Sequence, residues 1–490
     1  MRPAITGLAL LAIACSPAAA RRGNTVIMAS GADLQSPNPL LTVHPLARQV
    51  QRYALLVTLV RYDSTLSPAP YLARTWAWSA DRATLTMRLF GGLRWHDGAP
   101  TTAGDAAWTL EAARDPATGY PRRSDLADLA GVSAPDDTTL VLRFSRAMSG
   151  IPDVLTDLAL LPRHLLDTVP PGRLRRAQWN QRPVGNGPFR FVAHEPNRRW
   201  IFAANPAFPA ELGGPPRLER FVIAVVDEPT TKLAALTSGE LDLAGINPAH
   251  AEYVRRDPRL TVLDYPLLFT YALVLNLRRP PFDRLAARQA VAGAVDRRAI
   301  VDGALFGFAT PATGPLPPQL EQAEGRKDGR TEGTDGVLPS PFRPSAFPSD
   351  PIGFEMLTVG SGEASLEQML QSQFAAVGVR ARIRQLELST YLDRVQGPSH
   401  DFDAAVMGVA GDLGLGHLPR LLELAGLRPD GDRERLLQLF ADSLPAVFLY
   451  HARGVQGINR RVRGVRMDLR GELVTISQWA VDREQVAGSR

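Results

Sequence analysis

The sequence predicts an α/β protein of about three domains, and three observations support this. The chain has 490 residues, and a domain takes roughly 150. Residues 218–226 form a nearly continuous apolar run, which is typical of a strand buried on both faces. A helix that Asp227 can cap and Gly239 ends, and a short return strand at 241–243, follow and complete a β-α-β unit. Residues 71–111 add a strand, a turn and a helix.

The segment 71–111 is the most informative part of the chain. Apolar and polar residues alternate through 85–89, the period of a half-buried strand. Residues 95–98 read Trp-His-Asp-Gly, and the Asp-Gly pair predicts a turn. Thr102 stands three residues before Asp105, a spacing that predicts a capped helix start.

Composition limits the class of protein. Hydrophobic residues make up 45% and charged residues 21% of the chain, as in soluble globular proteins. The net charge is only +5, and no dense arginine run with interleaved aromatic residues is present. We therefore do not expect nucleic acid as a partner.

The N-terminus predicts export. An apolar stretch at 4–14 follows Arg2 and is too short to cross a bilayer as a helix. It runs into Leu-Ala-Ile-Ala-Cys at 11–15, which looks like a bacterial lipobox, so we expect Cys15 to carry a lipid. Cys15 is the sole cysteine, so no internal disulfide explains it. The alternative is an ordinary signal peptide cut after 18–20, with Cys15 incidental.

Three further segments carry motifs. They read Pro-Val-Gly-Asn-Gly-Pro-Phe at 183–189, a Thr-Thr-Lys-Leu-Ala-Ala-Leu run ending in Gly-Glu-Leu-Asp at 230–242, and Arg-Gln-Ala…Asp-Arg-Arg-Ala-Ile at 288–300. Together with 71–111, they resemble the extracytoplasmic solute-binding proteins of family 5, which serve dipeptide, oligopeptide and nickel ABC importers. The resemblance covers about 25–479.

The resemblance implies an α/β, two-lobed periplasmic-binding-protein fold (type II, Venus-flytrap) with an extra small α+β domain. The expected divisions are a lipoprotein signal peptide and tether at 1–22, lobe I at 23–60, 183–268 and 452–490, the small domain at 61–182, and lobe II at 269–451. Within lobe II, residues 321–350 are rich in Gly, Pro and charge, which predicts a flexible insertion.

The function that the resemblance implies is the substrate-binding component of an ABC importer. Such a protein binds peptides, or a related small solute, between its lobes and delivers them to a permease. We expect a monomer outside the cytoplasm, in the periplasm and held to the membrane by its lipid. No enzyme, cofactor or metal site is expected, because no Gly-x-Ser-x-Gly elbow, His-Glu-x-x-His motif or P-loop occurs.

Two residues after a predicted strand are the first ligand-binding candidates. Asp412, preceded by Gly411, stands where peptide-binding relatives hold the α-ammonium group of the ligand. Val409 replaces the tryptophan usual in those relatives. The alternative is that Asp412 caps a turn at the end of the strand.

Other candidates come from the edges of the expected cleft. The loop at 33–39 follows the first strand and, in relatives, lines the cleft, which makes Gln35 and Ser36 candidates. Tyr271 lines the cleft or is a core tyrosine with its hydroxyl at the rim. Residues 360–363 offer no arginine for a ligand carboxylate, so strict dipeptide specificity is not expected. Residues 48–60 are predicted as a helix.

Several alternatives remain open. His400, Asp401 and Asp403 form either a cation site or a solvated turn, and His417 is a candidate nickel or haem ligand. A degenerate receptor or scaffold that no longer imports would explain Val409 and a C-terminal region shorter than usual. A secreted hydrolase would need a second acidic residue beside Asp412.

Overall fold

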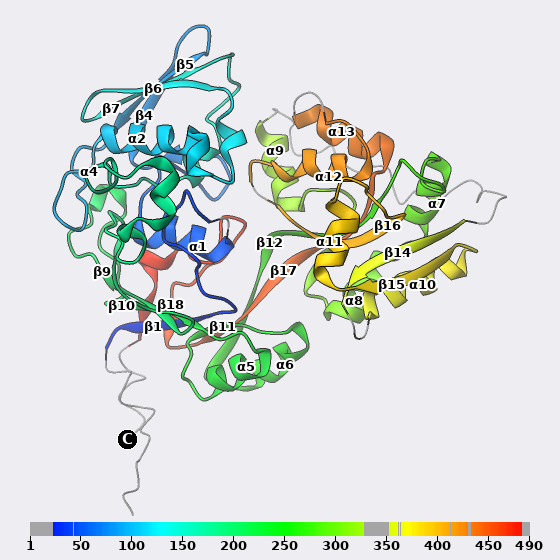
Figure 1. Cartoon of the computed structure of the whole chain (residues 1–490). Coiled ribbons are helices and arrows are strands. Elements are labelled where there is room, and N and C mark those ends of the chain that lie inside the picture. The colour runs from blue at the N-terminus through cyan, green and yellow to red at the C-terminus, as the bar shows by residue number, and fades with distance from the viewer. Residues whose placement is uncertain are drawn as a thin grey trace, which may run out of the picture.

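The computed structural model describes residues 23–42, 44–327, 352–360, 362, 364–411, 413–429 and 433–482. Two bodies lie side by side, and two long strands run from one into the other (Figure 1). These strands are β12 (Leu260–Leu275) and β17 (Ala446–Asn459). The α/β, two-lobed architecture predicted from the sequence is therefore confirmed.

One mixed sheet of 11 strands runs through the described part of both bodies, in the order β15-β14-β16-β12-β17-β11-β1-β10-β9-β8, with β13 paired to β17. Its other strands are β1 (Thr25–Ser30), β8 (Phe189–Glu195), β9 (Arg199–Ala204), β10 (Arg220–Val225), β11 (Leu243–Gly245), β13 (Ala309–Pro311), β14 (Gly353–Val359), β15 (Arg380–Leu386) and β16 (Ala404–Ala410). In β10, Phe221 and Ile223 are buried while Val222 and Ala224 are half-buried, so the predicted burial of both faces is only partly correct.

Helices cover both faces of the sheet in the right-hand body. Two separate hydrophobic clusters lie on the two sides of β12, β14 and β16. The described residues form the α-helices α1 (Pro45–Gln49), α2 (Ala103–Arg114), α3 (Val154–Asp157), α4 (Arg163–Leu166), α5 (Pro229–Thr237), α6 (Ala251–Arg256), α7 (Leu285–Ala294), α8 (Arg297–Leu305), α9 (Pro318–Lys327), α10 (Ser365–Ala376), α11 (Leu388–Gln396), α12 (His417–Ala425) and α13 (Arg433–Ser443).

A second sheet, in the order β4-β5-β7-β6, lies at the top of the left-hand body (Figure 1). Its strands are β4 (Ala73–Trp78), β5 (Thr84–Leu89), β6 (Leu129–Asp136) and β7 (Thr139–Phe144). Two separate two-stranded sheets pair β2 (Val60–Tyr62) with β3 (Pro68–Pro70) and β18 (Val462–Arg463) with β19 (Ala480–Val481). The predicted cap of α2 is present, because the Thr102 backbone N–H donates to Asp105 Oδ2 at 2.8 Å. The small domain shares one continuous hydrophobic core with the strands around β1.

The predicted helix at 48–60 is wrong in its second half. α1 continues into a π-helical turn, Val50–Leu55, and the chain then becomes extended at Leu56. The Leu55 carbonyl accepts hydrogen bonds from the backbone N–H groups of Asn186 and Gly187, at 3.2 and 2.9 Å. The Leu55 carbonyl, which would accept a hydrogen bond within a continuing helix, therefore accepts hydrogen bonds from the distant segment 183–189 instead.

The predicted flexible insertion at 321–350 begins too early. α9 extends to Lys327, with Pro318 at its first position and Leu320 buried in a lobe II cluster. A proline at this position suits a helix start, and one buried leucine ties the helix to the core. Residues 328–350 lie outside the described residues.

The pairing between β12 and β17 breaks midway along the two strands. Pro266 pairs with Arg453 and Thr270 with His451, so β12 contains two residues more than β17 in this interval. His451 is buried, its Nδ1 lies 2.9 Å from Thr270 Oγ1, and burial lowers its pKa to about 4. We propose this break as the hinge between lobe I and lobe II, and we keep the other predicted divisions as proposed boundaries.

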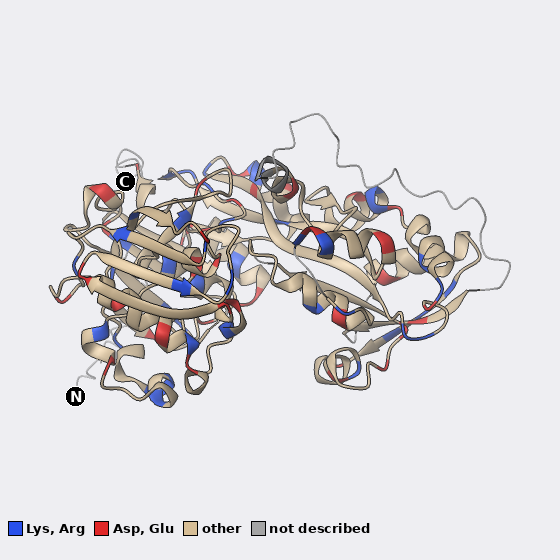
Figure 2. Cartoon of the chain, turned by 90° about the horizontal axis from the view of Figure 1, so that it is seen from above, with Lys and Arg blue, Asp and Glu red and all other residues tan. Residues whose placement is uncertain are grey.

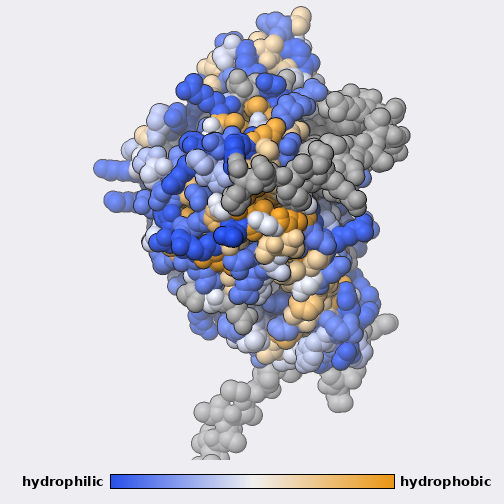
Figure 3. Space-filling model, turned by 90° about the vertical axis from the view of Figure 1, so that its right-hand side faces the viewer, coloured by the Kyte–Doolittle hydropathy of each residue, from blue (hydrophilic) through white to orange (hydrophobic). Residues whose placement is uncertain are grey.

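Charged residues of both signs are spread over the two bodies (Figure 2). The outer end of lobe II is mostly hydrophilic, with hydrophobic residues in a few places (Figure 3). Among the described residues, none of the helices combines the length and the hydrophobicity that crossing a membrane requires.

Candidate functional site

The directions of the strands identify the candidate site. β12 runs from lobe I into lobe II, and both β12 and β11 are antiparallel to β17, so β11 runs in the same direction as β12. β1 is parallel to β11 and to β10. These strands of lobe I therefore point toward lobe II. β16 is antiparallel to β12 and parallel to β14, which is parallel to β15, so the strands of lobe II point toward lobe I. The carboxyl edges of the two halves therefore face each other across the proposed hinge, and such edges are where α/β proteins bind ligands.

The loop after β1 lies on the lobe I edge and is held by Asp33. The Asp33 carboxylate accepts hydrogen bonds from Trp200 Nε1 at 2.5 Å and from the Asn197 backbone N–H at 2.9 Å, and it lies 2.9 Å from His194 Nε2. Burial alone would raise its pKa, but these donors outweigh burial and lower the pKa to about 2. Asp33 is thus an ionised anchor for the loop.

Gln35 and Ser36 lie in this loop, as predicted, and their hydrogen bonds mainly stabilise the loop itself. Gln35 is exposed at φ +61°, and its side-chain oxygen accepts a hydrogen bond from Thr42 Oγ1 at 2.8 Å. Ser36 Oγ accepts from the Asn38 backbone N–H at 3.1 Å, and the Ser36 carbonyl accepts from Gln51 Nε2 at 3.2 Å. The exposed side of Gln35 is the part of this loop that remains for a ligand.

Tyr271 and Gly411 lie together on the lobe II edge. The backbone of Gly411 donates to the Leu268 carbonyl at 2.7 Å, directly beside the hinge. Tyr271, three residues further along β12, is half-buried and stacks on Tyr450 with ring centroids 4.8 Å apart. Burial, with a smaller effect from Glu367, raises the pKa of Tyr271. Tyr271 is thus neutral and has an aromatic face fixed near the cleft.

Two predicted site residues, Asp412 and Cys15, lie outside the described residues. The neighbours of Asp412 are described: Gly411 contacts the hinge as above, and the Leu413 carbonyl accepts a hydrogen bond from Arg433 Nη2 at 3.2 Å. The hydrogen bonds of Gln35 and Ser36 described above go to Thr42, Asn38 and Gln51 of lobe I and not to the lobe II candidates.

The sequence interpretation missed an apolar part of the lobe II edge. Val359 ends β14 and Leu388 follows β15, and these side chains are 44% and 52% exposed. Leu392, one turn further along α11, is also exposed. The sequence alone did not mark these residues, because one apolar residue at or after the end of a strand shows no function until the direction of the strand in the sheet is known. An apolar edge suits a ligand with apolar groups.

A buried ion cluster supports the lobe I loop from behind. The Asp157 carboxylate binds the guanidinium groups of Arg48, Arg52 and Arg122, the last two at 2.7 Å. Burial would raise the pKa of Asp157, but Arg52, Arg48 and Arg122 together hold it far below its usual range. A hollow beside this cluster is lined by residues that include Arg48, Thr42 and Gln51, so the cluster and the loop are adjacent.

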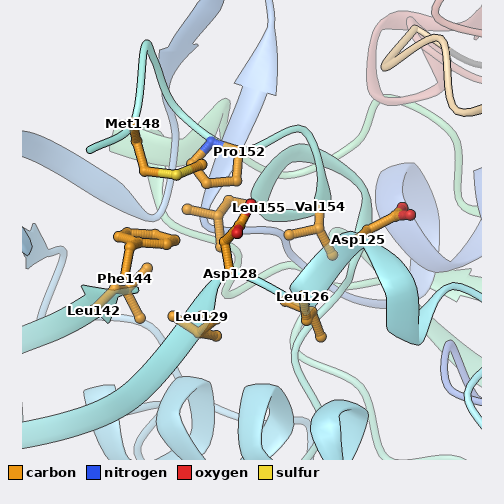
Figure 4. A pocket seen from close by; sticks show the side chains of 10 residues that line it. All are labelled: Asp125, Leu126, Asp128, Leu129, Leu142, Phe144, Met148, Pro152, Val154 and Leu155. Carbon is orange, nitrogen blue, oxygen red and sulfur yellow. The ribbon is translucent and has the colours of Figure 1, made fainter. Parts of the chain in front are cut away.

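A second hollow lies inside the small domain and not on the carboxyl edges. Four leucines and Phe144 make up half of the residues that line it, with Met148 and Pro152 on one side (Figure 4). Asp128, also on the wall, pairs with Arg146 at 2.6 Å. This hollow lies between β6, β7 and the start of α3, and we do not assign a ligand to it.

The residues of the alternative cation site point to different partners. Asp401 pairs with Arg279 at 2.8 Å, and Asp403 Oδ2 accepts from the Glu355 backbone N–H at 3.0 Å. His400 Nδ1 lies 3.1 Å from the Val395 carbonyl. These contacts favour the turn over the cation site. Gly411 lies close to His417, since a Cβ there would be 3.1 Å from His417 Cε1.

The chain matches a model of a protein family. The model of the bacterial extracellular solute-binding proteins, family 5 (middle region), matches residues 67–346, which is more than half of the chain. This range includes most of the proposed small domain, the β10-α5-β11 unit and the start of the proposed lobe II.

Individual proteins show the same similarity. A Brucella ovis protein assigned to peptide binding in an ABC transporter is 31% identical over 256 residues, or 52% of this chain and 48% of its own, so the match spans about half the length of that relative. The di/tripeptide-binding protein 2 of Pseudomonas aeruginosa is 26% identical over 80% of this chain and 78% of its own. The oligopeptide-binding protein of Bacillus subtilis, solved with a nonapeptide, superimposes with a TM-score of 0.71 at 19% identity, covering 94% of this chain and 99% of that one.

Proposed function

The chain belongs to family 5 of the bacterial extracellular solute-binding proteins, and from this premise we propose that it is the substrate-binding component of an ABC importer. It binds a short peptide, or a related small solute, between its lobes and delivers it to a permease. The observation that carries the proposal is the pair of carboxyl edges that face each other across the β12–β17 hinge. Closure around a guest excludes water and strengthens each polar contact inside.

The names of the relatives support a peptide as the ligand. One relative is named for di- and tripeptides, and a protein of the same fold was solved with a nonapeptide. In this chain, the apolar edge at Val359 and Leu388 would contact side chains of the peptide, and Tyr271 would add an aromatic surface. Binding and release need no catalytic group, so we propose that the protein is not an enzyme and acts as a monomer.

The role of Asp412 gives the sharpest test. We expect the Asp412→Asn substitution to weaken binding of a peptide with a free α-ammonium group about 10- to 100-fold, because a charge-assisted hydrogen bond contributes about 1.5–3 kcal/mol. Isothermal titration with the same peptide, free and N-acetylated, measures the effect.

The acetylated peptide is the matched control, because it has no charge for Asp412 to bind. Wild type should prefer the free peptide, and the variant should bind both forms alike. Equal losses for both forms would assign Asp412 to the fold and not to the ligand. If a broad peptide library causes neither compaction in X-ray scattering nor a thermal shift, peptide binding itself is rejected. That result would favour the degenerate receptor that Val409 suggests.

We also propose that Cys15 carries a lipid that keeps the protein outside the cytoplasm, at the membrane surface. The support is the small-residue sequence before Cys15 and the absence of any other cysteine in the chain. The Cys15→Ala variant should move from the membrane pellet to the soluble extracytoplasmic fraction and lose labelling by a fatty-acid analogue. A wild-type protein that is not labelled would leave the ordinary signal peptide as the explanation.

A further inference from the structure

The hairpin between β2 and β3 has an unusual tip. Its loop is clamped by Asp63, whose Oδ1 accepts from the backbone N–H groups of Thr65 at 2.8 Å and Ser67 at 3.0 Å. Leu66, next to the end of the loop, adopts φ +61° and is only 6% exposed. Glycine or asparagine is the usual residue in this left-handed conformation, and a hairpin tip is usually exposed. A buried leucine here therefore needs a partner outside the hairpin.

That partner is lobe II. Leu66 belongs to a buried cluster whose other described members all come from residues 272–448, apart from Leu469. The cluster includes Leu415, which precedes α12, has φ +59° and is 4% exposed. Two leucines in left-handed conformations thus belong to one cluster, one from each side of the interlobe boundary. Such conformations persist where the surrounding packing imposes them, and they gather in switch regions.

The lobe I side holds the hairpin firmly. Arg470 Nη1 donates to the Tyr62 carbonyl at 3.3 Å, and the Arg470 carbonyl accepts from the Tyr53 hydroxyl at 3.1 Å. The Tyr62 hydroxyl is hydrogen-bonded to Asp153. On the same side, Arg61 lies 3.5 Å above the ring of Tyr71. The hairpin is therefore anchored at its base.

Helix α13 of lobe II contributes Phe440 to the same buried cluster as Leu66. Burial and Asp153 raise the pKa of Tyr62 in the hairpin, and a hydrogen bond with Thr156 and, to a smaller extent, the positive charge of Arg433 oppose this rise. Electrostatics and packing thus agree that the tip sits against the α12–α13 side of lobe II.

We propose that Leu66, with Leu469, forms a non-covalent joint between the lobes, in addition to β12 and β17, and that this joint sets the equilibrium between lobe arrangements. When the lobes separate at this edge, Leu66 leaves the lobe II cluster and becomes exposed to water. Burial of one leucine shifts such an equilibrium about 10- to 100-fold. The joint acts with or without a ligand, so it does not depend on the identity of the solute.

Leu66→Asn tests the joint, because asparagine tolerates the left-handed conformation and removes the apolar contact. Spin labels at Val192→Cys in lobe I and Leu285→Cys in lobe II, both exposed positions, report interlobe distances in ligand-free protein carrying Cys15→Ser. We expect a longer and broader distance distribution than in the labelled parent protein, and about 10-fold weaker binding of whichever peptide the parent protein binds.

Two further variants serve as controls. Leu66→Met keeps the apolar contact and should restore the parent distribution. Leu165→Asn changes an exposed leucine on α4 and should leave the distances unchanged. Leu66→Gly, which suits φ +61°, guards against misfolding of the asparagine variant and should match it. If Leu66→Asn and Leu66→Gly are both folded, by circular dichroism, and give the parent distribution, the joint is overturned and the importer proposal is unaffected.

Discussion

Replacing Asp157 with asparagine is expected to lower the free energy of unfolding by about 3–5 kcal/mol, as does removal of one partner from a buried ion cluster. The Asp157 carboxylate is buried and meets three guanidinium groups. Asparagine keeps the shape but leaves Arg48 and Arg52 without the carboxylate that binds both. Urea unfolding at pH 7, followed by circular dichroism, measures the change.

The pH dependence of this loss adds a second measurement. The pKa of Asp157 is far lower in the folded state, so the unfolded state binds the proton first, and the contribution of the carboxylate to stability is present above about pH 4. Below that pH, the difference in the free energy of unfolding between the Asp157→Asn variant and wild type should become smaller. Asp128→Asn is the control, because its pair with Arg146 is exposed and should contribute no more than about 1 kcal/mol. A loss for Asp157→Asn as small as that of the control would contradict the proposed role of the cluster.

Gly185→Ala is expected to have the second large effect, a loss of about 3 kcal/mol or more, as in severe overpacking. A Cβ at Gly185 would lie 2.0 Å from the Leu55 carbonyl oxygen and 3.0 Å from His96 Cε1. His96 already holds segment 183–189 in place, since its Nδ1 accepts from the Gly185 backbone N–H at 3.2 Å and its Nε2 lies 3.0 Å from the Gly187 carbonyl. The backbone at Leu55 would have to move.

Gly150→Ala provides the comparison, because a Cβ there meets nothing within 4 Å. That variant should be neutral or slightly more stable, since alanine restricts the unfolded chain. The midpoints of thermal unfolding of the two variants and wild type decide the question. Similar midpoints for Gly185→Ala and Gly150→Ala would show that segment 183–189 is free to move away from the π-helical turn.

His96 shows how a local pattern acquires a tertiary role. The Trp-His-Asp-Gly turn was predicted from residues 95–98 alone. Only the folded chain brings the imidazole against segment 183–189, where burial, partly offset by the hydrogen bond to Gly187, lowers the pKa of His96 to about 4. The neutral ring can then accept a hydrogen bond at one nitrogen and donate at the other.

Some residues of the candidate site could likewise be predicted from the sequence, whereas others could be recognised only in the folded structure. Gly411 and Tyr271 were predicted separately and lie beside the same hinge, because β12 and β16 pair there. Val359 and Leu388 were overlooked, since a single apolar residue after a strand carries no signal until the strand direction is known. Asp412 and Cys15 stay predictions.

The sequence by itself determined the elements that depend on neighbours along the chain: the strand at 85–89, the Thr102–Asp105 cap and the alternation of strands and helices that makes an α/β protein. Tertiary structure alone decided where the helix after α1 ends, which arginines meet Asp157 and what buries Leu66. The reason is physical. Periodicity and capping act within one or two turns, whereas a carbonyl, a carboxylate or a leucine is satisfied by whichever distant group the packing brings to it.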